Sequence, residues 1–130
     1  MAIATNHVWG PSPISQKYDE GFWSFKNDRV STLNAAVSTI PKDAGVSAVY
    51  YIVPHLTHRT RIYEFPNPFK PTNWGVRDEK PHSPRIIQYI ILDERSLTEE
   101  HRATLAGLEP SQFTRIFDRD DIFVLKRKQP

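Results

Sequence analysis

The chain has 130 residues, of which 38% are hydrophobic, 25% charged and 12% aromatic, a composition typical of one folded globular domain. Its 17 Lys and Arg residues against 15 Asp and Glu residues leave a net charge of +2, which gives no electrostatic case for a nucleic-acid-binding protein. The absence of cysteine excludes disulfides, thiolate metal sites, thiol nucleophiles and iron–sulfur clusters.

The first 27 residues contain prolines and glycines and show no sustained hydrophobic period. We therefore predict an extended N-terminal arm over residues 1–27 and a single α/β domain over residues 28–130. The arm carries the aromatic residues Trp9, Tyr18, Phe22, Trp23 and Phe25. So many rings need a surface to cover, either the core of the domain or a partner or membrane interface, and both readings stay open.

A helix is predicted to start at Asn27 or Asp28, because either side chain can cap the first free N–H groups. It ends before Pro41, which prevents regular helix beyond Ile40. Its apolar face is formed by four residues at helical spacing, Val30, Leu33, Val37 and Ile40.

Residues 46–65 predict a βαβ unit. The β-prone residues 46–49 precede residues 50–58, which have room for one or two helical turns with Pro54 near the start. Residues 61–65 alternate and are rich in β-formers, so they predict a second strand. The two strands are expected to be parallel, with a right-handed connection.

Five prolines between residues 66 and 84 exclude a central strand or an uninterrupted helix. A loop of this length inside a compact domain is often functional. We expect its first half, residues 65–75, to be ordered, and residues 76–83 to be mobile.

Residues 86–92 are almost continuously apolar, which is typical of a strand covered on both faces. Asp93 follows at the carboxyl end of this strand. Ser96 is predicted to cap the next helix, with Glu99 completing the capping box. Gly107 is predicted to close that helix in the left-handed conformation.

The last segment predicts a β-hairpin. Residues 113–117 and 122–125 are β-prone, and the four polar residues 118–121 between them suit a turn. The order of elements then predicts an α/β fold: a three-layer Rossmann-like sandwich with a mainly parallel sheet of four or five strands and a C-terminal antiparallel hairpin. We expect the order 2-1-3 for the first three strands, with the hairpin at the edge beyond them.

Neither a nucleotide nor a metal is indicated. The first strand–helix turn, residues 48–51, reads AVYY and lacks the glycines with which nucleotide-binding turns approach a pyrophosphate. His55 and His58 would share one side of a helical turn, with Glu64 and His82 as the nearest third ligands, but this spacing is common by chance. We expect no cofactor and no metal.

Candidate catalytic groups are few. Ser47, Ser83 and Ser96 do not lie in a nucleophile-elbow motif. Asp93 and Asp118 follow strands whose ends we expect at one edge of the sheet, where two carboxylates can bind a sugar or a cation. The alternative reading is that both residues only end their strands and bond loop amides.

Three segments of the first half, IPKDAGVSA (40–48), VPHLTHR (53–59) and IYEFPNP (62–68), carry a family resemblance. They resemble the C-terminal region of large multi-span prokaryotic membrane proteins catalogued as domain of unknown function 2079, a family related to GT-C glycosyltransferases that use lipid-linked sugars. WGPSP (9–13) resembles the segment that leaves the last membrane span. The likeness covers residues 9–93 closely and the rest loosely, and it departs at Tyr50, where relatives often have asparagine.

The resemblance implies a soluble extracytoplasmic domain of a longer, membrane-attached protein whose spans precede Ile3. Such a domain is accessory: it holds an acceptor or covers the active site and is not catalytic by itself. No catalytic residue is carried over, because the usual catalytic acid of GT-C enzymes lies in a loop between early membrane helices. The implied partners are the membrane-embedded part of the same polypeptide and a glycan or lipid-linked sugar, with no nucleic acid.

The candidate ligand-binding surface combines the proline-rich loop with the segment PHLTHR. Trp74 can stack on a sugar face, and Asn67 and Asn73 can bond hydroxyls. The full candidate set is His55, His58, Arg59, Asn67, Lys70, Asn73, Trp74 and Asp93. The plain alternative is that these segments only pack the end of the domain.

Two other functions remain open from the sequence. A free-standing enzyme would use Asp93 and Asp118 in a cleft at the sheet edge. A protein-interaction module would dock Trp9, Phe22 and Trp23 against membrane helices.

Overall fold

The computed structural model describes residues 7–8, 15, 28–72 and 82–128. Most of the predicted arm, with its aromatic residues, lies outside the described residues, as does Asn27. So do two candidate ligand-binding residues, Asn73 and Trp74, and almost all of the segment expected to be mobile.

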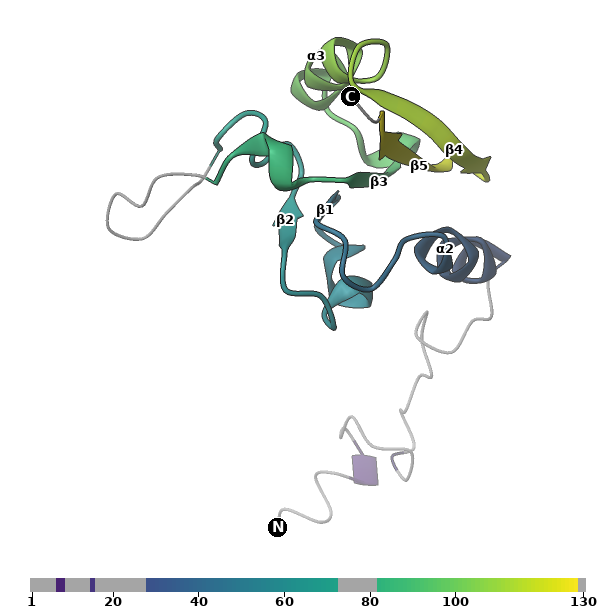
Figure 1. The fold of residues 1–130 in the computed structure, drawn as a ribbon. Helices are drawn as coiled ribbons and strands as arrows, with labels where there is room; N and C mark the ends of the chain where they lie inside the picture. Colours follow the sequence, from purple (N-terminus) through teal and green to yellow (C-terminus); the bar gives the residue numbers. More distant parts are fainter. Residues whose placement is uncertain (1–6, 9–14, 16–27, 73–81, 129–130) are drawn as a thin grey trace.

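Two helices and five strands form the described domain (Figure 1). The helices are α2 (Asp28–Ser38) and α3 (Glu99–Leu108). The strands are β1 (Val46–Ala48), β2 (Ile62–Glu64), β3 (Tyr89–Asp93), β4 (Phe113–Arg119) and β5 (Ile122–Arg127). Short 3₁₀ helices are η2 (Val53–Leu56), η3 (Pro84–Ile86) and η4 (Glu94–Ser96). Within the described part of the chain, no helix is long and apolar enough to cross a membrane.

The strands form one sheet in the order β2-β1-β3-β5-β4. Strand β1 pairs in parallel with β2 and β3, whereas β5 pairs antiparallel with β3 and β4. The predicted order 2-1-3 with a hairpin beyond it is therefore confirmed. The predicted mainly parallel sheet is not confirmed, because the hairpin makes the sheet mixed.

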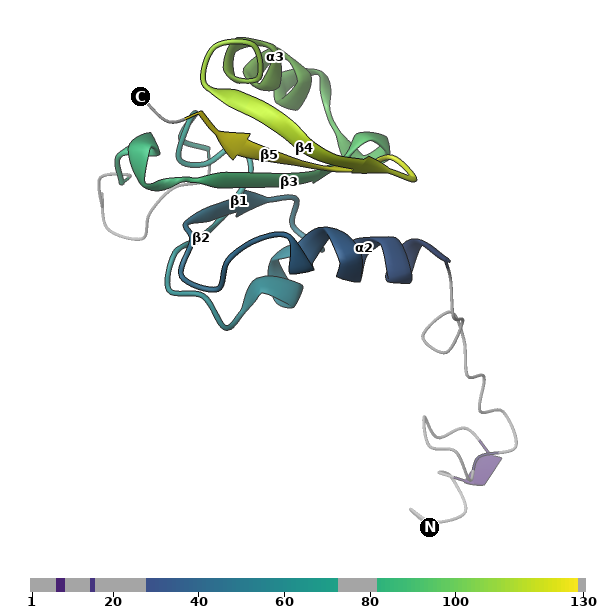
Figure 2. The same cartoon turned by 45° about the vertical axis from the view of Figure 1, so that its right-hand side comes forward.

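Helices lie on both sides of this sheet. Figure 2 shows α2 and η2 on one side and α3 on the other. All five residues of β3 are buried, as its apolar sequence predicts. The core is made of apolar residues from the central strands and from the helix faces that pack on them, chiefly Leu33, Ala36, Ile52, Leu56, Ile90, Ile91, Leu92, Phe113, Phe123 and Leu125.

The buried face of α2 differs from the predicted one. Leu33 and Ile40 are buried, but Val30 is 49% exposed. Thr32 and Ala36, four positions apart, are buried instead. Thr32 can occupy this face because its hydroxyl donates a hydrogen bond to the carboxylate of Asp120.

The predicted start of α3 is wrong by two residues. Thr98, not Ser96, is the cap: its Oγ1 accepts from the N–H of His101 at 3.2 Å, and His101 Nδ1 accepts from the N–H of Thr98 at 3.5 Å. Ser96 ends η4 and donates to the carbonyl of Asp93 at 2.8 Å. Gly107 is wrong as a cap as well, because it lies inside the helix.

Gly45 brings β1 and β3 together. Its carbonyl accepts hydrogen bonds from the N–H groups of Gln88 and Tyr89, at 2.9 and 3.1 Å. A Cβ at this position would lie 2.2 Å from the carbonyl oxygen of Ile86, so only glycine fits. Because residues 84–86 form η3, β3 starts later than the predicted residue 86.

The terminal hairpin turns more tightly than predicted. Asp120 and Asp121 are its two central residues, with φ of 52° and 65°. Two successive residues with positive φ are typical of a type I′ turn, which matches the twist of the flanking strands. Aspartate tolerates this conformation better than most residues, so both strands extend further toward the turn than the polar run 118–121 predicts.

Candidate functional site

Asp93 occupies the carboxyl end of β3, where the sequence predicts it. Its side chain is only 7% exposed. Oδ2 accepts hydrogen bonds from the Tyr51 hydroxyl and from the guanidinium of Arg29, and Oδ1 accepts from the N–H of Arg95 at 3.0 Å. Both carboxylate oxygens are therefore engaged by the protein.

These contacts keep Asp93 ionised. Burial opposes its charge, but the hydrogen bonds from Tyr51, Arg95 and Arg29 outweigh burial and hold the pKa of Asp93 below its usual value. Burial and the bond to Asp93 raise the pKa of Tyr51 well above that of free tyrosine. Asp93 thus joins α2, the turn between β1 and η2, and η4, which is a structural role.

The carboxylate of Asp118 does not lie beside that of Asp93. It lies on β4 opposite Phe123, whereas Asp93 lies opposite Ile122, so β5 separates the two carboxylates. Asp118 is 55% exposed and pairs with Arg115 at 2.8 Å. The predicted pair of strand-end carboxylates is therefore wrong, because the hairpin partner strand is inserted between them.

The carboxylate beside Asp93 is that of Asp121, from the hairpin turn. Asp121 Oδ2 lies 3.6 Å from Arg29 Nη1 and 2.6 Å from both Nε and Nη2 of Arg95. No sequence signal marks Asp121 as a neighbour of Asp93, because the contact depends on where the tight turn ends.

The histidine segment lies apart from the proline-rich loop. His55 and His58, in and after η2, are exposed. Arg59 donates to the carbonyls of Ile40 and Pro41 at 2.7 and 3.2 Å, and burial lowers its pKa. These contacts connect the segment after η2 to the residues that follow α2, on that side of the sheet.

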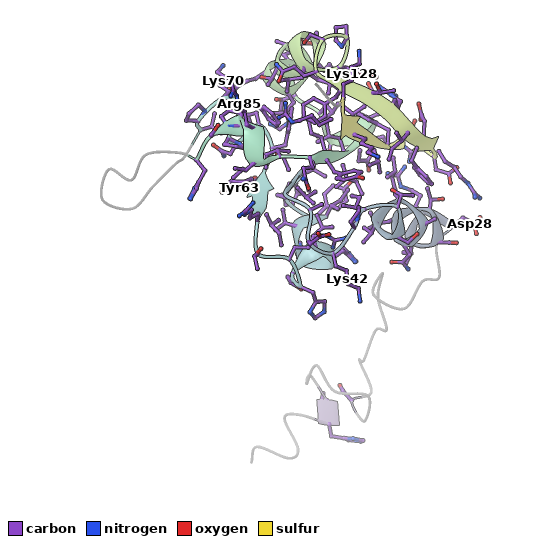
Figure 3. The ribbon with its side chains drawn as sticks, in the orientation of Figure 1. Asp28, Lys42, Tyr63, Lys70, Arg85 and Lys128 are labelled. Atoms are coloured by element: carbon purple, nitrogen blue, oxygen red, sulfur yellow. The ribbon has the colours of Figure 1, made fainter. Side chains whose placement is uncertain are left out.

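Lys70 lies on the opposite side, where its Nζ pairs with Glu100 of α3 at 3.0 Å. Figure 3 shows Lys70 and Lys42, which follows α2, at opposite sides of the sheet. The structure therefore does not bring these two described residues together: it places Arg59 beside the end of α2 and Lys70 beside α3.

The first part of the loop is ordered around Asn67, which is buried. Its Nδ2 donates to the carbonyl of Thr72 at 3.0 Å, and its Oδ1 accepts from the N–H of Thr72 at 3.0 Å. Its backbone carbonyl accepts from Ser47 Oγ at 2.7 Å. The Asn67 amide therefore closes the loop on itself instead of presenting two free atoms to a ligand, the role predicted for it.

Between this loop and the start of α3 lies a cavity of about 250 Å³. It lies just beyond the carboxyl end of β2, at the edge of the sheet where open α/β folds hold ligands. Its lining is mostly polar and consists of Glu64, Phe65, Pro66, Asn67, Thr72, Thr98, Glu100 and His101. We refer to it as the Glu64–His101 cavity.

Two polar groups of this cavity have no hydrogen-bond partner within residues 28–72 and 82–128. The Glu64 carboxylate accepts no hydrogen bond from any residue in the described ranges. His101 Nδ1 accepts from the N–H of Thr98, so the neutral ring carries its proton on Nε2, which has no acceptor among the same residues. The Phe65 ring packs edge-on against the His101 ring at 5.5 Å, which fixes its orientation. The cavity thus offers one acceptor and one donor.

Sequence reasoning missed most of this cavity. The sequence predicts Asn67 as a binding residue, and the predicted Lys70 pairs with the lining residue Glu100. It indicates Glu64 only as a third metal ligand and predicts no ligand-binding role for Thr98, Glu100 or His101. A usable signal exists: in the run TEEH a histidine occupies the third helical position, where a capping box ordinarily has glutamate or glutamine. In the described segments, no group of three or more acidic or histidine side chains is arranged to hold a metal.

Comparison with known proteins adds no relative. No protein-family model, no curated protein and no solved structure matches the chain.

Proposed function

We propose that this chain is an accessory domain that holds a hydroxyl-rich ligand in the Glu64–His101 cavity. One observation carries the proposal. A single polar cavity is lined by an acceptor, the Glu64 carboxylate, and by a donor, His101 Nε2, that have no partner among the described residues. A hydroxyl group both donates and accepts, so it matches both groups at once. Sugars present such groups at high density.

The state of the nucleophile candidates supports a binding role over a catalytic one. Ser47 Oγ donates to the Asn67 carbonyl, and Ser96 Oγ donates to the Asp93 carbonyl. Ser83 Oγ accepts from the N–H of Arg85 at the start of η3. Among the residues that the structure describes, none of these hydroxyls is hydrogen-bonded to a histidine or carboxylate base, which an activated serine requires.

The larger setting is proposed from the sequence resemblance. The domain would lie on the extracytoplasmic side of a membrane protein similar to GT-C glycosyltransferases, with the membrane-embedded part of the same polypeptide as partner. The ligand would be a glycan or a lipid-linked sugar. Four lining residues, Glu64 to Asn67, fall within the segment 62–68 that carries the resemblance.

We also propose that the fold is a Rossmann-like sandwich of three layers. Helices on both sides of the sheet support this description (Figure 2), as does the parallel arrangement β2-β1-β3. The antiparallel hairpin is then an extension of that parallel unit at one edge.

Calorimetric titration with a panel of neutral mono- and disaccharides tests the binding role. We expect binding that Glu64→Gln weakens about tenfold, because an ionised acceptor makes hydrogen bonds worth about 1.5–3 kcal/mol. Glu99→Gln is the matched control, because Glu99 lies at the start of α3, is exposed and does not line the cavity. Equal affinity of the two variants, or no binding of any sugar, would reject the proposal.

The coding sequence upstream of Ile3 tests the membrane setting separately. Several hydrophobic spans in frame before Ile3 would support it. A start codon at Met1 with no such spans would remove it and leave the binding role standing.

A further inference from the structure

A second cavity, of about 340 Å³, lies at the amino end of β3. It is formed by the turn after α2, the start of β3 and the end of β5. Its lining residues are Pro41, Asp43, Gln88, Tyr89, Lys126, Arg127 and Lys128. It shares no residue with the Glu64–His101 cavity, so what it binds is a separate question.

Tyr89 is the unexplained group of this second cavity. It is only 8% exposed, and its hydroxyl makes no hydrogen bond to any residue of the described segments. Buried tyrosine hydroxyls ordinarily have a partner, since an unsatisfied one costs about 1–3 kcal/mol. A hydroxyl left free beside a cavity points to a ligand or solvent molecule that satisfies it.

Lys126 supplies a positive charge opposite Tyr89. It is the register partner of Tyr89 across β3 and β5, which puts both side chains on the same face of the sheet. Lys126 is exposed, and its ammonium group has no carboxylate within 4.0 Å among the residues that the structure describes. Tyr89 and a cation with no ion pair among the described residues are therefore neighbours on one face of the sheet.

Two further cations surround this pair. Arg127 ends β5 and donates to the carbonyls of Ile87 and Pro84, at 2.7 Å each. Lys128 donates to the carbonyl of Pro110 at 3.0 Å. Both charges are held by neutral acceptors, and neither forms an ion pair with an acid in the described part of the chain. Asp43 is the one carboxylate in the lining, against three cations.

Arg85 adds to the positive potential. Burial lowers the pKa of Arg127, and the nearby positive charge of Arg85 lowers it further. By contrast, cations elsewhere in the domain, such as Lys70 and Arg102, are paired with carboxylates. Figure 3 shows Arg85 and Lys128 on the part of the molecule that holds the start of β3 and the end of β5.

We propose that this second cavity binds a phosphoryl group, with the Tyr89 hydroxyl and the Lys126 ammonium as its donors. A phosphate monoester carries close to two negative charges and several acceptor oxygens, which suits three cations and one hydroxyl better than a single carboxylate would. The volume leaves room for a substituent on the ester. The group can belong to a free phosphate ester or to a lipid headgroup.

Binding of inorganic phosphate and of a simple phosphate monoester, followed by NMR on the isotope-labelled chain, tests the proposal. We expect Lys126→Gln and Tyr89→Phe each to weaken binding about tenfold, the effect of losing one charge-assisted hydrogen bond. Lys70→Gln is the control, since Lys70 is paired with Glu100 and lies outside this cavity. Tyr89→Phe is expected to leave the melting temperature unchanged or higher, because the hydroxyl has no hydrogen-bond partner to lose among the described residues.

A second arm identifies the source of the phosphoryl group. Co-sedimentation with phosphatidylcholine vesicles that contain phosphatidic acid, but not with pure phosphatidylcholine vesicles, would assign it to a lipid, provided that Lys126→Gln removes it. Binding of free phosphate alone would assign it to a small ester. Absence of binding in both arms would overturn the proposal, as would binding that neither variant changes.

Discussion

Arg29, in the first turn of α2, forms an ion pair with Asp93, the last residue of β3, 64 positions away. Arg29 Nη1 also donates to the carbonyl of Asp120 at 3.0 Å. One guanidinium therefore connects a helix, the end of the central strand and the hairpin turn. Since Arg29 is 25% exposed and Asp93 only 7%, removing the cation would leave a mostly buried charge without its counterion.

Replacing Asp93 by asparagine is expected to lower the free energy of unfolding by about 2 kcal/mol, because three hydrogen bonds to an ionised acceptor are weakened. Urea-induced unfolding measures this loss. Asp118→Asn is the matched control: its partner Arg115 lies on the surface, so a change within about 0.5 kcal/mol is expected. Equal losses in the two variants would contradict the structural role of Asp93.

The stability of the protein is expected to fall in acid partly through Asp93. Its pKa is lower in the folded chain than in the unfolded one, so its contribution is complete above the unfolded pKa of about 3.9 and is lost as pH falls through that value and below. Unfolding free energies measured from neutral pH into acid should therefore decline less steeply in Asp93→Asn than in the wild type. Parallel curves would contradict the assignment.

Tyr51 is expected to make the free energy of unfolding fall as pH rises, the opposite dependence to that of Asp93. Burial and the bond to Asp93 raise its pKa, so its contribution is complete below the unfolded pKa of about 10 and is lost as pH rises above it. The wild type should lose stability above about pH 10 more steeply than Tyr51→Phe. Thermal melts across this range would show the difference, and identical slopes would count against it.

The fold was largely readable from the sequence because its signals are local. Three elements lie within a few residues of their predicted places: β3 at the apolar run, β2 at the alternating run, and η2 with Pro54 near its start. What failed depends on tertiary contacts. Val30 fits the apolar period of α2, but the sheet contacts the face that carries Thr32 and Ala36.

The candidate site was harder to predict from the sequence than the fold, because its residues come together only through tertiary contacts. Asp93 and Asp118 both end predicted strands, but whether they meet depends on which strand of the hairpin pairs with β3. The order of hairpin strands is not encoded in their own residues. Likewise, Glu64 and His101 line one cavity only because the loop after β2 folds toward α3, and the sequence of neither segment predicts this arrangement.

Two glycines provide a matched pair of stability tests. Gly45→Ala places a Cβ 2.2 Å from the Ile86 carbonyl oxygen, and because backbone must move, we expect a loss of about 2–3 kcal/mol. Gly107→Ala meets nothing within 4 Å and lies inside α3, where alanine is the better helix former, so a gain of about 0.5–1 kcal/mol is expected. Thermal unfolding of both variants measures the contrast. A tolerated Gly45→Ala would contradict the close approach of β1 and β3.

Replacing Arg59 tests whether this residue has a structural role or a ligand-binding role. Because its guanidinium donates to the carbonyls of Ile40 and Pro41, Arg59→Ala should lower the free energy of unfolding by about 1 kcal/mol and leave saccharide affinity unchanged. His58→Ala, at a neighbouring exposed position, should change stability by less than about 0.5 kcal/mol. A variant of Arg59 that folds normally and loses ligand binding would instead support the histidine segment as the site.

A map of backbone amide shifts during saccharide titration tests the claim that the Glu64–His101 cavity holds a hydroxyl-rich ligand. We predict that shifts concentrate in residues 64–72 and 98–101, which line and border the cavity, and that Glu64→Gln reduces them. Shifts confined to residues 53–59, or shifts that Glu64→Gln leaves unchanged, would contradict the claim.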